Sequence, residues 1–448
     1  MDPRLDELTD RLIAAARRAG ADAADALAVA EESRSVTVRD KALESADRSE
    51  GLEIGLRVLI GQRQAAVAAS DIKDATIEEL ALRAVAMARE APEDPWCGLA
   101  DPSLLATDMD VAALELDDPG EALTPAVLQE RAHEAEDAAR AVAGISQVDD
   151  ASAGQGRARI HLQASNGFSG GYARSQSWLS CVAIAGTGLG MERDYAVEAR
   201  CHAADLPEAH TVGTRAAARA VARTGARKPP TGAVPVVYDE RLAGGLIGHL
   251  LSAINGTAIA RRASWAADLC DSAVLPGNLG LLEEPRRVRA GASRPFDAEG
   301  LATERREIVA DGILRTWTLD LATARQLGLQ STANASRAPS SAPRPAVSNI
   351  RLTGGHGGRE DLLREMGRGL LITELLGASI NPTTGDYSRG AAGFWVENGE
   401  IAYPVNECTV AGNLKPMLAS LRAADDADPS RSRLVPSLLV DGLTVAGA

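Results

Sequence analysis

The sequence predicts an α+β protein with two domains, each built on a mostly antiparallel sheet packed with helices. Segments with helical spacing of apolar residues alternate with short runs rich in Val, Ile and Leu that lie between turn residues. The chain has 448 residues, which is more than one hydrophobic core usually serves. A proline-rich stretch, RKPPTGAVP at 227–235, interrupts both periodicities. We therefore expect an N-terminal domain over 1–228 and a C-terminal domain over 229–448.

The N-terminal half is predicted to contain two sets of strands, each accompanied by helices. The first helix should end at Gly20, and Gly61-Gln62 has the composition of a hairpin turn. A polar, proline-containing connection over 92–119 separates the two sets. Helical periodicity occurs over 4–19, 75–90, 121–143 and 205–226. Strand patterns fill 25–70 and 145–203.

The C-terminal half is predicted to begin with a buried strand, VPVVYD, whose last residue caps a helix. Asp239 is a good N-cap for the helix ERLAGGLIGHLLSAIN, which we expect Asn255-Gly256 to close. A hairpin turn is expected at Asp311-Gly312. The Ser/Ala/Pro-rich segment 331–349 has the composition of a long, mobile loop. A helix over 359–368, a strand over 369–375 and a final strand in LLVDGLTVAGA complete the prediction.

Aromatic residues are concentrated in one segment, 385–417. The chain has only 13 aromatic residues, and this segment holds four: Tyr387, Phe394, Trp395 and Tyr403. Asn398-Gly399 lies between two strand-like runs and suits the two positive φ angles of a type I′ turn. The sequence therefore predicts a β-hairpin.

Polar residues at the start of the same segment allow two interpretations. Asp386, Ser388 and Arg389 could present an acid, a hydroxyl and a guanidinium at a cleft. Alternatively, hydrogen bonds from Asp386 and Ser388 could hold a turn. The residues alone do not decide between these two.

The charge and the cysteines exclude several classes of protein. A net charge of −15 argues against nucleic-acid binding, which relies on clustered Lys and Arg. The acidic amino terminus does not resemble a signal peptide, and no apolar run approaches the roughly 18 residues of a membrane span. Five cysteines without a CxxC pair indicate reduced thiols in the core. We expect a soluble, cytoplasmic protein.

Two glycine-rich motifs are better explained as turns than as sites. Residues 167–171, GFSGG, match the GxSxG pattern of a serine hydrolase, but strand-like sequence lies on both sides where a helix should follow. Residues 186–190, GTGLG, lack the spacing and the following helix of a dinucleotide site. Neighbours in a strand point to opposite faces, so Cys201 and His202 should not share a metal.

His249 is the one histidine of the six in a suggestive setting. It lies on the helix opened by Asp239, where Gly244, Gly245 and Gly248 would allow a close backbone approach. The residues that share its helical face, Ser252 and Ala253, bind transition metals poorly. Its role could be that of a packing residue or of a ligand, and packing is the simpler account.

Several long motifs together resemble a known family. In order along 230–418 they are GGLIGHLLSAINGTAIARR, PFDAEGLATERREIVADGIL, TELLGASI, GDYSRGAAGFWVENGEIAYPVNE and TVAGNLKPM. They resemble the TldD/PmbA family, and within it the PmbA branch, which is also called TldE. The N-terminal half agrees more loosely.

The resemblance implies a cytoplasmic metallopeptidase that acts on unfolded or extended peptides together with a TldD-type partner. In that family the catalytic subunit carries an HExxxH motif and a downstream metal-binding Cys. Here His249 matches the first His, but Leu250 and Ile254 occupy the positions of the Glu and the second His, and no Cys follows Cys408. Zinc and catalysis are therefore expected in the partner, and this chain should be a non-catalytic subunit without metal.

The resemblance also suggests where this subunit would contribute to a peptide cleft. An older description of the family as a modulator of DNA gyrase would then reflect an indirect effect. The cleft candidates are His249, Asp386, Tyr387, Ser388, Arg389 and Asn413.

Two other functions remain open from the sequence. The chain could be a stand-alone module that binds peptides or a protein without any protease. It could instead be an independent hydrolase that uses Ser169 or Cys201. In isolation, without its partner, the chain could form a homodimer.

Overall fold

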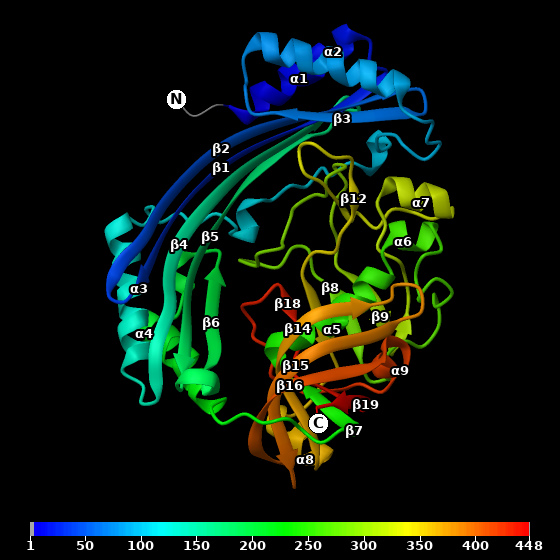
Figure 1. The fold of residues 1–448 in the computed structure, drawn as a ribbon. Helices are drawn as coiled ribbons and strands as arrows, with labels where there is room; N and C mark the ends of the chain where they lie inside the picture. The colour runs from blue at the N-terminus through cyan, green and yellow to red at the C-terminus, as the bar shows by residue number, and fades with distance from the viewer. Residues whose placement is uncertain (1–3, 448) are drawn as a thin grey trace.

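A long curved sheet from the N-terminal half arches over a smaller and more irregular C-terminal half in the computed structural model, which describes residues 4–447 (Figure 1). Both halves combine helices with mostly antiparallel strands, which confirms the predicted two-domain α+β fold. None of the helices in the described residues is long and apolar enough to cross a membrane.

The arched sheet has six antiparallel strands in the order β3-β2-β1-β4-β5-β6. The chain twice forms a unit of one helix, three strands and a second helix. The two units meet where β1 pairs with β4. The strands are β1 (Ala23–Arg39), β2 (Ala42–Ile60), β3 (Arg63–Ala69), β4 (Ile145–Ala164), β5 (Ser169–Ala185) and β6 (Glu192–Arg200). The helices are α1 (Leu5–Ala19), α2 (Asp74–Glu90), α3 (Pro125–Arg140) and α4 (Ala209–Ala222).

All four helices cover the convex face of the arch (Figure 1). Alternate residues of a strand point to opposite faces of the sheet. The side chains on the convex face pack against the helices and form two hydrophobic cores. Ile54 packs under α1 and α2, and Leu179 packs under α3 and α4. The opposite set forms the concave face, which is turned toward the C-terminal half.

The turns of the N-terminal half agree with the prediction. Gly20 ends α1 with φ of 96°, and Gly61-Gln62 joins β2 to β3. The connection over 92–119 contains only two short 3₁₀ turns, Pro102–Leu104 and Ala112–Leu114.

In the C-terminal half, five strands close into a ring. The sheet order is β16-β15-β14-β7-β19-β17, and β16 also pairs with β19. Only the pair of β7 and β14 is parallel in this sheet. The strands are β7 (Gly232–Tyr238), β14 (Gly369–Ile380), β15 (Asp386–Glu397), β16 (Glu400–Asn413), β17 (Arg422–Ala423) and β19 (Leu438–Ala446).

A second, five-stranded sheet and several short helices complete this half. The strands, in sheet order, are β10 (Ile313–Leu314), β9 (Arg306–Ala310), β8 (Gly280–Glu283), β13 (Ile350–Thr353) and β18 (Arg433–Leu434). A separate pair is β11 (Ala335–Ser336) and β12 (Arg344–Pro345). The helices are α5 (Glu240–Ala253), α6 (Gly256–Ala260), α7 (Leu321–Leu327), α8 (Arg359–Met366) and α9 (Leu414–Ala419).

The aromatic hairpin forms as predicted. β15 and β16 pair in antiparallel register on both sides of Asn398-Gly399, whose φ angles are 53° and 77°. Two successive positive φ angles are the signature of a type I′ turn. Trp395 on β15 is almost fully buried in the large core of this half.

Two details of α5 differ from the prediction. The helix ends with Ile254 as its C-cap, while the Asn255 side chain accepts a hydrogen bond from Thr257 N and opens α6 instead of closing α5. No neighbouring backbone among the described residues packs closely against the glycines of α5. Gly244 and Gly248 lie beside the Arg433 side chain, and no other group approaches the Cβ position of Gly245.

The prediction of a mobile loop over 331–349 is wrong, because buried contacts fix this segment against the arch. Arg337 is buried and forms an ion pair with Asp25 on β1. Asp25 also accepts a hydrogen bond of 2.7 Å from Arg57 Nε on β2. Glu299 is buried nearby, and its negative charge acts to raise the pKa of Arg57 and of Arg337. Composition did not reveal this anchoring because it depends on contacts of individual residues, Arg337 among them, with distant parts of the chain.

Candidate functional site

Three of the predicted cleft residues lie together between α5 and β15. The His249 and Tyr387 rings meet edge to face with their centroids 5.7 Å apart. Burial, with a smaller contribution from the positive charge of Arg389, lowers the pKa of His249. Both effects favour the neutral form of the imidazole. Tyr387 is only 3% exposed, so it acts mainly as a packing partner.

Asp386 and Asn413 form a separate pair that holds a turn. Asn413 donates to Asp386 Oδ1 at 3.0 Å and to Thr384 O at 3.0 Å. The Thr384 hydroxyl donates to Asp386 Oδ2 at 2.6 Å, and Asn413 also caps α9. Ser388 makes no side-chain hydrogen bond among the described residues. The turn interpretation of Asp386 thus holds, while that of Ser388 does not.

The positions after His249 on α5 are core positions. Leu250 and Ile254 have no exposed surface and both belong to the main apolar core of the C-terminal half. Within residues 4–447, no three His, Cys, Asp or Glu side chains come together in a way that could hold a metal ion.

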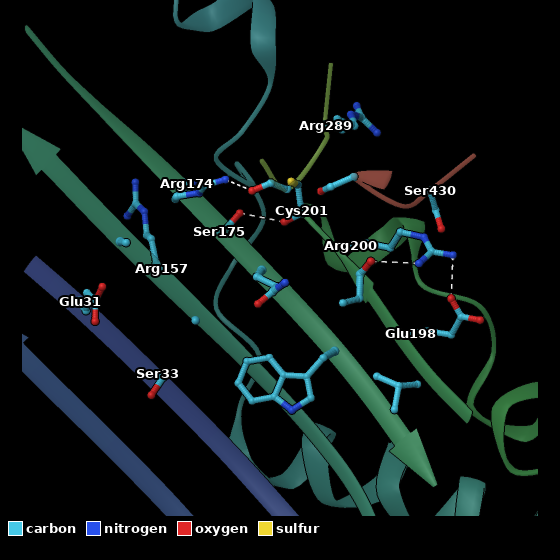
Figure 2. Close-up of a pocket in the computed structure, with 18 of the residues that line it drawn as sticks. Glu31, Ser33, Arg157, Arg174, Ser175, Glu198, Arg200, Cys201, Arg289 and Ser430 are labelled. Carbon is cyan, nitrogen blue, oxygen red and sulfur yellow. Dashed lines mark hydrogen bonds and ion pairs between the residues drawn. The ribbon is translucent and has the colours of Figure 1, made fainter. Parts of the chain in front are cut away.

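A large pocket lies elsewhere, between the concave face of the arch and two segments of the C-terminal half. Its volume is about 650 Å³. Small residues of four strands form its floor: Ser33, Ser49, Gly51, Gly156, Ala158 and Ala199. Residues 289–291 and 428–432 of the C-terminal half form the opposite wall. Figure 2 shows Glu31, Arg157, Arg174 and Ser430 around this space. None of the predicted cleft residues lines it.

Arginine contacts fix the two walls of the pocket to each other. Arg174 on β5 donates to the carbonyl of Gly291 (Figure 2). Arg289 pairs with Glu115 at 2.6 Å and with Asp205 at 3.0 Å, both from the N-terminal half. The pocket therefore exists within a single chain as a defined space between its two domains.

The two nucleophile candidates lie in settings that do not activate them strongly. Cys201 is buried in the pocket wall, and burial raises the pKa of its thiol. Ser169 follows a tight turn between β4 and β5 and not a strand-to-helix elbow, which confirms the turn interpretation. Its hydroxyl is nevertheless 3.4 Å from His161 Nε2, a neighbour that the sequence did not suggest.

Sequence reasoning missed the pocket because its walls come from segments that are far apart in the chain. One available signal was the presence of glycines inside strand patterns, at Gly51, Gly154 and Gly156. Glycine weakens a strand and often marks a place where another group approaches closely.

Comparison with known proteins gives matches along most of the chain. Models of the PmbA/TldA metallopeptidase domains match at residues 24–88 (domain 1), 118–224 (central domain) and 231–447 (C-terminal domain). The metalloprotease PmbA of Escherichia coli O157:H7 is 36% identical over 417 residues, which covers 92% of this chain and 90% of that protein. The chain belongs to the PmbA branch of the TldD/PmbA family. A PmbA homologue of Haemophilus influenzae is 35% identical over 415 residues, with the same coverage.

Solved structures agree with this membership. A proposed modulator of DNA gyrase from Bacteroides thetaiotaomicron superposes with a TM-score of 0.91 at 27% identity, covering 99% of this chain and 98% of that one. TldE from Thermococcus kodakarensis has a TM-score of 0.84 at 18% identity, covering 98% and 100%, and so shows the shared fold. In this PmbA-branch chain, the strands of the first two family domains belong to the same sheet, the arch.

Proposed function

We propose that this chain is the non-catalytic subunit of a zinc peptidase that it forms with a TldD-type paralogue. In this complex the paralogue supplies the zinc ion and the catalytic residues. This chain contributes part of the cleft for unfolded or extended peptides. The proposal places both subunits in the cytoplasm and requires no cofactor in this chain.

The observation that carries the proposal is the environment of α5. A zinc peptidase needs several nitrogen, oxygen or sulfur ligands and a general base near the metal-bound water. In this chain, apolar core side chains occupy the two positions that would supply the base and a second ligand after His249. His249 alone provides one ligand, and its neighbours Tyr387 and Arg389 do not complete a zinc shell.

The pocket on the concave face supports a role in holding peptides. Its floor of small side chains leaves the strand backbones accessible, and its volume is in the range of ligand pockets. The relatives that match over 90% of their length are named as metalloproteases, which agrees with peptides as the ligand class.

The test is to measure zinc content and peptide cleavage for the purified chain alone and mixed with the TldD-type paralogue of the same genome. We expect no stoichiometric zinc and no cleavage from the chain alone, and zinc-dependent cleavage from the mixture. Stoichiometric zinc together with cleavage by the lone chain would refute the proposal. A variant of the paralogue without its HExxxH glutamate serves as the control for contaminating proteases.

One observation favours a second candidate, a stand-alone module that binds peptides. Residues of this one chain form both the floor and the opposite wall of the pocket. Tight peptide binding by the lone chain, together with failure to co-purify with the paralogue, would support this alternative over the complex.

A further inference from the structure

Trp178 is a partly buried indole on the wall of the large pocket. It lies on β5 and points to the concave face, since the adjacent Leu179 points to the helix-covered core. The chain has five tryptophans. Trp265, Trp317 and Trp395 are 6%, 6% and 1% exposed, and Trp96 lies outside the pocket. Trp178 is therefore the one tryptophan whose ring borders this pocket.

Glycine on the neighbouring strand lets the Trp178 ring lie on the sheet. Gly154 on β4 pairs with Trp178, and a Cβ atom at residue 154 would lie 2.1 Å from the indole Cζ2. Gly156 lies under the edge of the same ring, with its Cβ position 3.9 Å from Cζ3. Any side chain at residue 154 would push the ring away. The ring thus covers bare backbone with one face and borders the pocket, which is the arrangement of a stacking platform.

Glu31 provides a charge at the other side of the pocket floor. It is exposed on β1, and among the described residues it has no ion pair and no hydrogen bond through its side chain. The arginines of the pocket differ in this respect. Arg289 and Arg200 each pair with a carboxylate, and Arg174 bonds to a carbonyl. Glu31 is therefore an uncompensated negative charge that faces the pocket.

The strand register fixes the separation of these two features. Glu31 pairs with Ala158, which pairs with Arg174, so Trp178 lies two strands across and four residues along from Glu31. With about 4.8 Å between strands and about 3.3 Å per residue, the two side chains start roughly 16 Å apart. An extended peptide covers about 13 Å in four residues, an even separation that keeps both side chains on one face, and a long lysine or arginine side chain can reach the rest of the distance.

We propose that the concave face binds an extended peptide through two side chains about four residues apart, which point to the same face of the peptide. One is an aromatic side chain stacked on Trp178, and the other is a lysine or arginine paired with Glu31. This inference rests on the proposed function in taking peptides as the ligand. It adds that this subunit itself selects peptides by their aromatic and basic side chains. Small residues of the ligand would lie between the two contacts, over the cross-strand neighbours Ser33, Gly156 and Gln176.

The test uses fluorine NMR of the full-length chain labelled with 5-fluorotryptophan. The Trp178→Phe variant assigns the Trp178 resonance among the five. The probe is the unstructured peptide acetyl-YSGSK-amide at millimolar concentration, with zinc chelated so that no cleavage occurs. We expect a saturable shift of the Trp178 resonance and none of the Trp96 resonance. Changing the tyrosine of the probe to serine should weaken binding at least about fivefold.

The Glu31→Gln variant gives an independent readout that does not depend on Trp178. Glu31 is exposed, and its side chain forms no hydrogen bond or ion pair within residues 4–447, so the substitution should leave the fold intact. For the native chain, changing the lysine of the probe to glutamate should weaken binding at least about fivefold, and Glu31→Gln should abolish this discrimination. An unshifted Trp178 resonance, no binding at all, or full discrimination retained by Glu31→Gln would each overturn the inference.

These outcomes are separate from those of the proposed function. If cleavage with the paralogue succeeds while the Trp178 resonance does not respond, the inference fails and the proposed function stands. If the resonance responds as expected while the mixture shows no cleavage, the inference stands and the proposed complex fails.

Discussion

Leu250 illustrates how core packing restricts the side chains that one position of this fold can carry. The residue follows His249 directly and has no exposed surface. A carboxylate at this position would have to lose its hydration without a cation nearby, and burying an unpaired charge is very unfavourable. The packing of α5 therefore disfavours a carboxylate at residue 250, whatever acid is placed there.

Replacing Leu250 with Glu should destabilise the chain instead of giving it activity. We expect a loss of about 3 kcal/mol or more in the free energy of unfolding, measured by urea denaturation, because of the buried charge. Leu250→Met is the matched control and should cost less than about 1.5 kcal/mol. A folded Leu250→Glu, Ile254→His double variant that binds zinc stoichiometrically would contradict this account.

Glu299 is a buried acid whose charge state links stability to pH. Burial, reinforced by the negative charges of Asp297 and Asp320, raises the pKa of Glu299 well above its usual range. The folded chain thus holds a proton that the unfolded chain releases at lower pH. Stability from this group is fully present below the unfolded pKa and is lost as the pH rises through the folded pKa.

The Glu299→Gln variant should be more stable than the native chain at alkaline pH and should lose this advantage near pH 4. Glutamine cannot ionise, and its amide oxygen can still accept the hydrogen bond from Leu321 N. Each unit of the shift corresponds to about 1.4 kcal/mol, so we expect a gain of at least about 1 kcal/mol. Thermal unfolding from pH 4 to 9 measures it, and the exposed Glu304→Gln is the control. A stability difference that does not vary with pH would contradict the raised pKa.

At the scale of elements, the aromatic hairpin depends on its two-residue turn. Asn398 and Gly399 both adopt positive φ angles. A Cβ atom at residue 399 would also lie 2.8 Å from the Cα of Arg364 on α8. The turn therefore has to accommodate both an unusual backbone conformation and a neighbouring helix.

Replacing Asn398-Gly399 with Val-Val should destabilise folding and assembly with the paralogue together. Strain of about 1–3 kcal/mol at each residue predicts a loss of roughly 2–6 kcal/mol in denaturant unfolding. Asn398→Asp, which tolerates the same backbone conformation, is the control. Loss of peptide turnover with folding and assembly intact would instead indicate that the hairpin takes part in the reaction directly.

Elements with local signals could be predicted from the sequence, and contacts between distant segments could not. Gly20, Asp239 and Asn398-Gly399 each have a backbone role that their residue type reveals. Asn255-Gly256 misled the prediction because Asn serves equally well at the start of the next helix. The pocket was not predicted, since the residues that line it, such as Trp178 and Gly291, come from two different domains.

At the scale of the whole molecule, one arginine joins the two halves through a buried ion pair. Arg337 comes from the C-terminal half and reaches Asp25 in the first strand of the arch. The Pro339 carbonyl lies so close to Gly55 on β2 that a Cβ atom there would be 2.1 Å away. The segment 331–349 thus works as a strap between the domains.

The Arg337→Ala variant should release this strap. Removing one partner of a buried ion pair costs about 3–5 kcal/mol, and here it should also free the strap locally. Limited digestion with proteinase K should cut within 331–349 faster than in the native chain. Arg344→Ala, an exposed arginine on the same segment, should leave the digestion pattern unchanged. Equal resistance of Arg337→Ala and the native chain would show that other contacts hold the strap.

The pairing of β1 with β4 leaves β1 without a partner on one edge while the ribosome synthesises the chain. β1 pairs with residues 151–164, which the ribosome adds more than 100 residues after β1 itself. At about 5–20 residues per second, β1 waits several seconds or longer with one edge unpaired. Its middle carries Glu31, Glu32 and Arg34. Charges on an open edge discourage pairing with the wrong chain. The same glutamate that we assign to peptide recognition would thus also protect the nascent protein from aggregation.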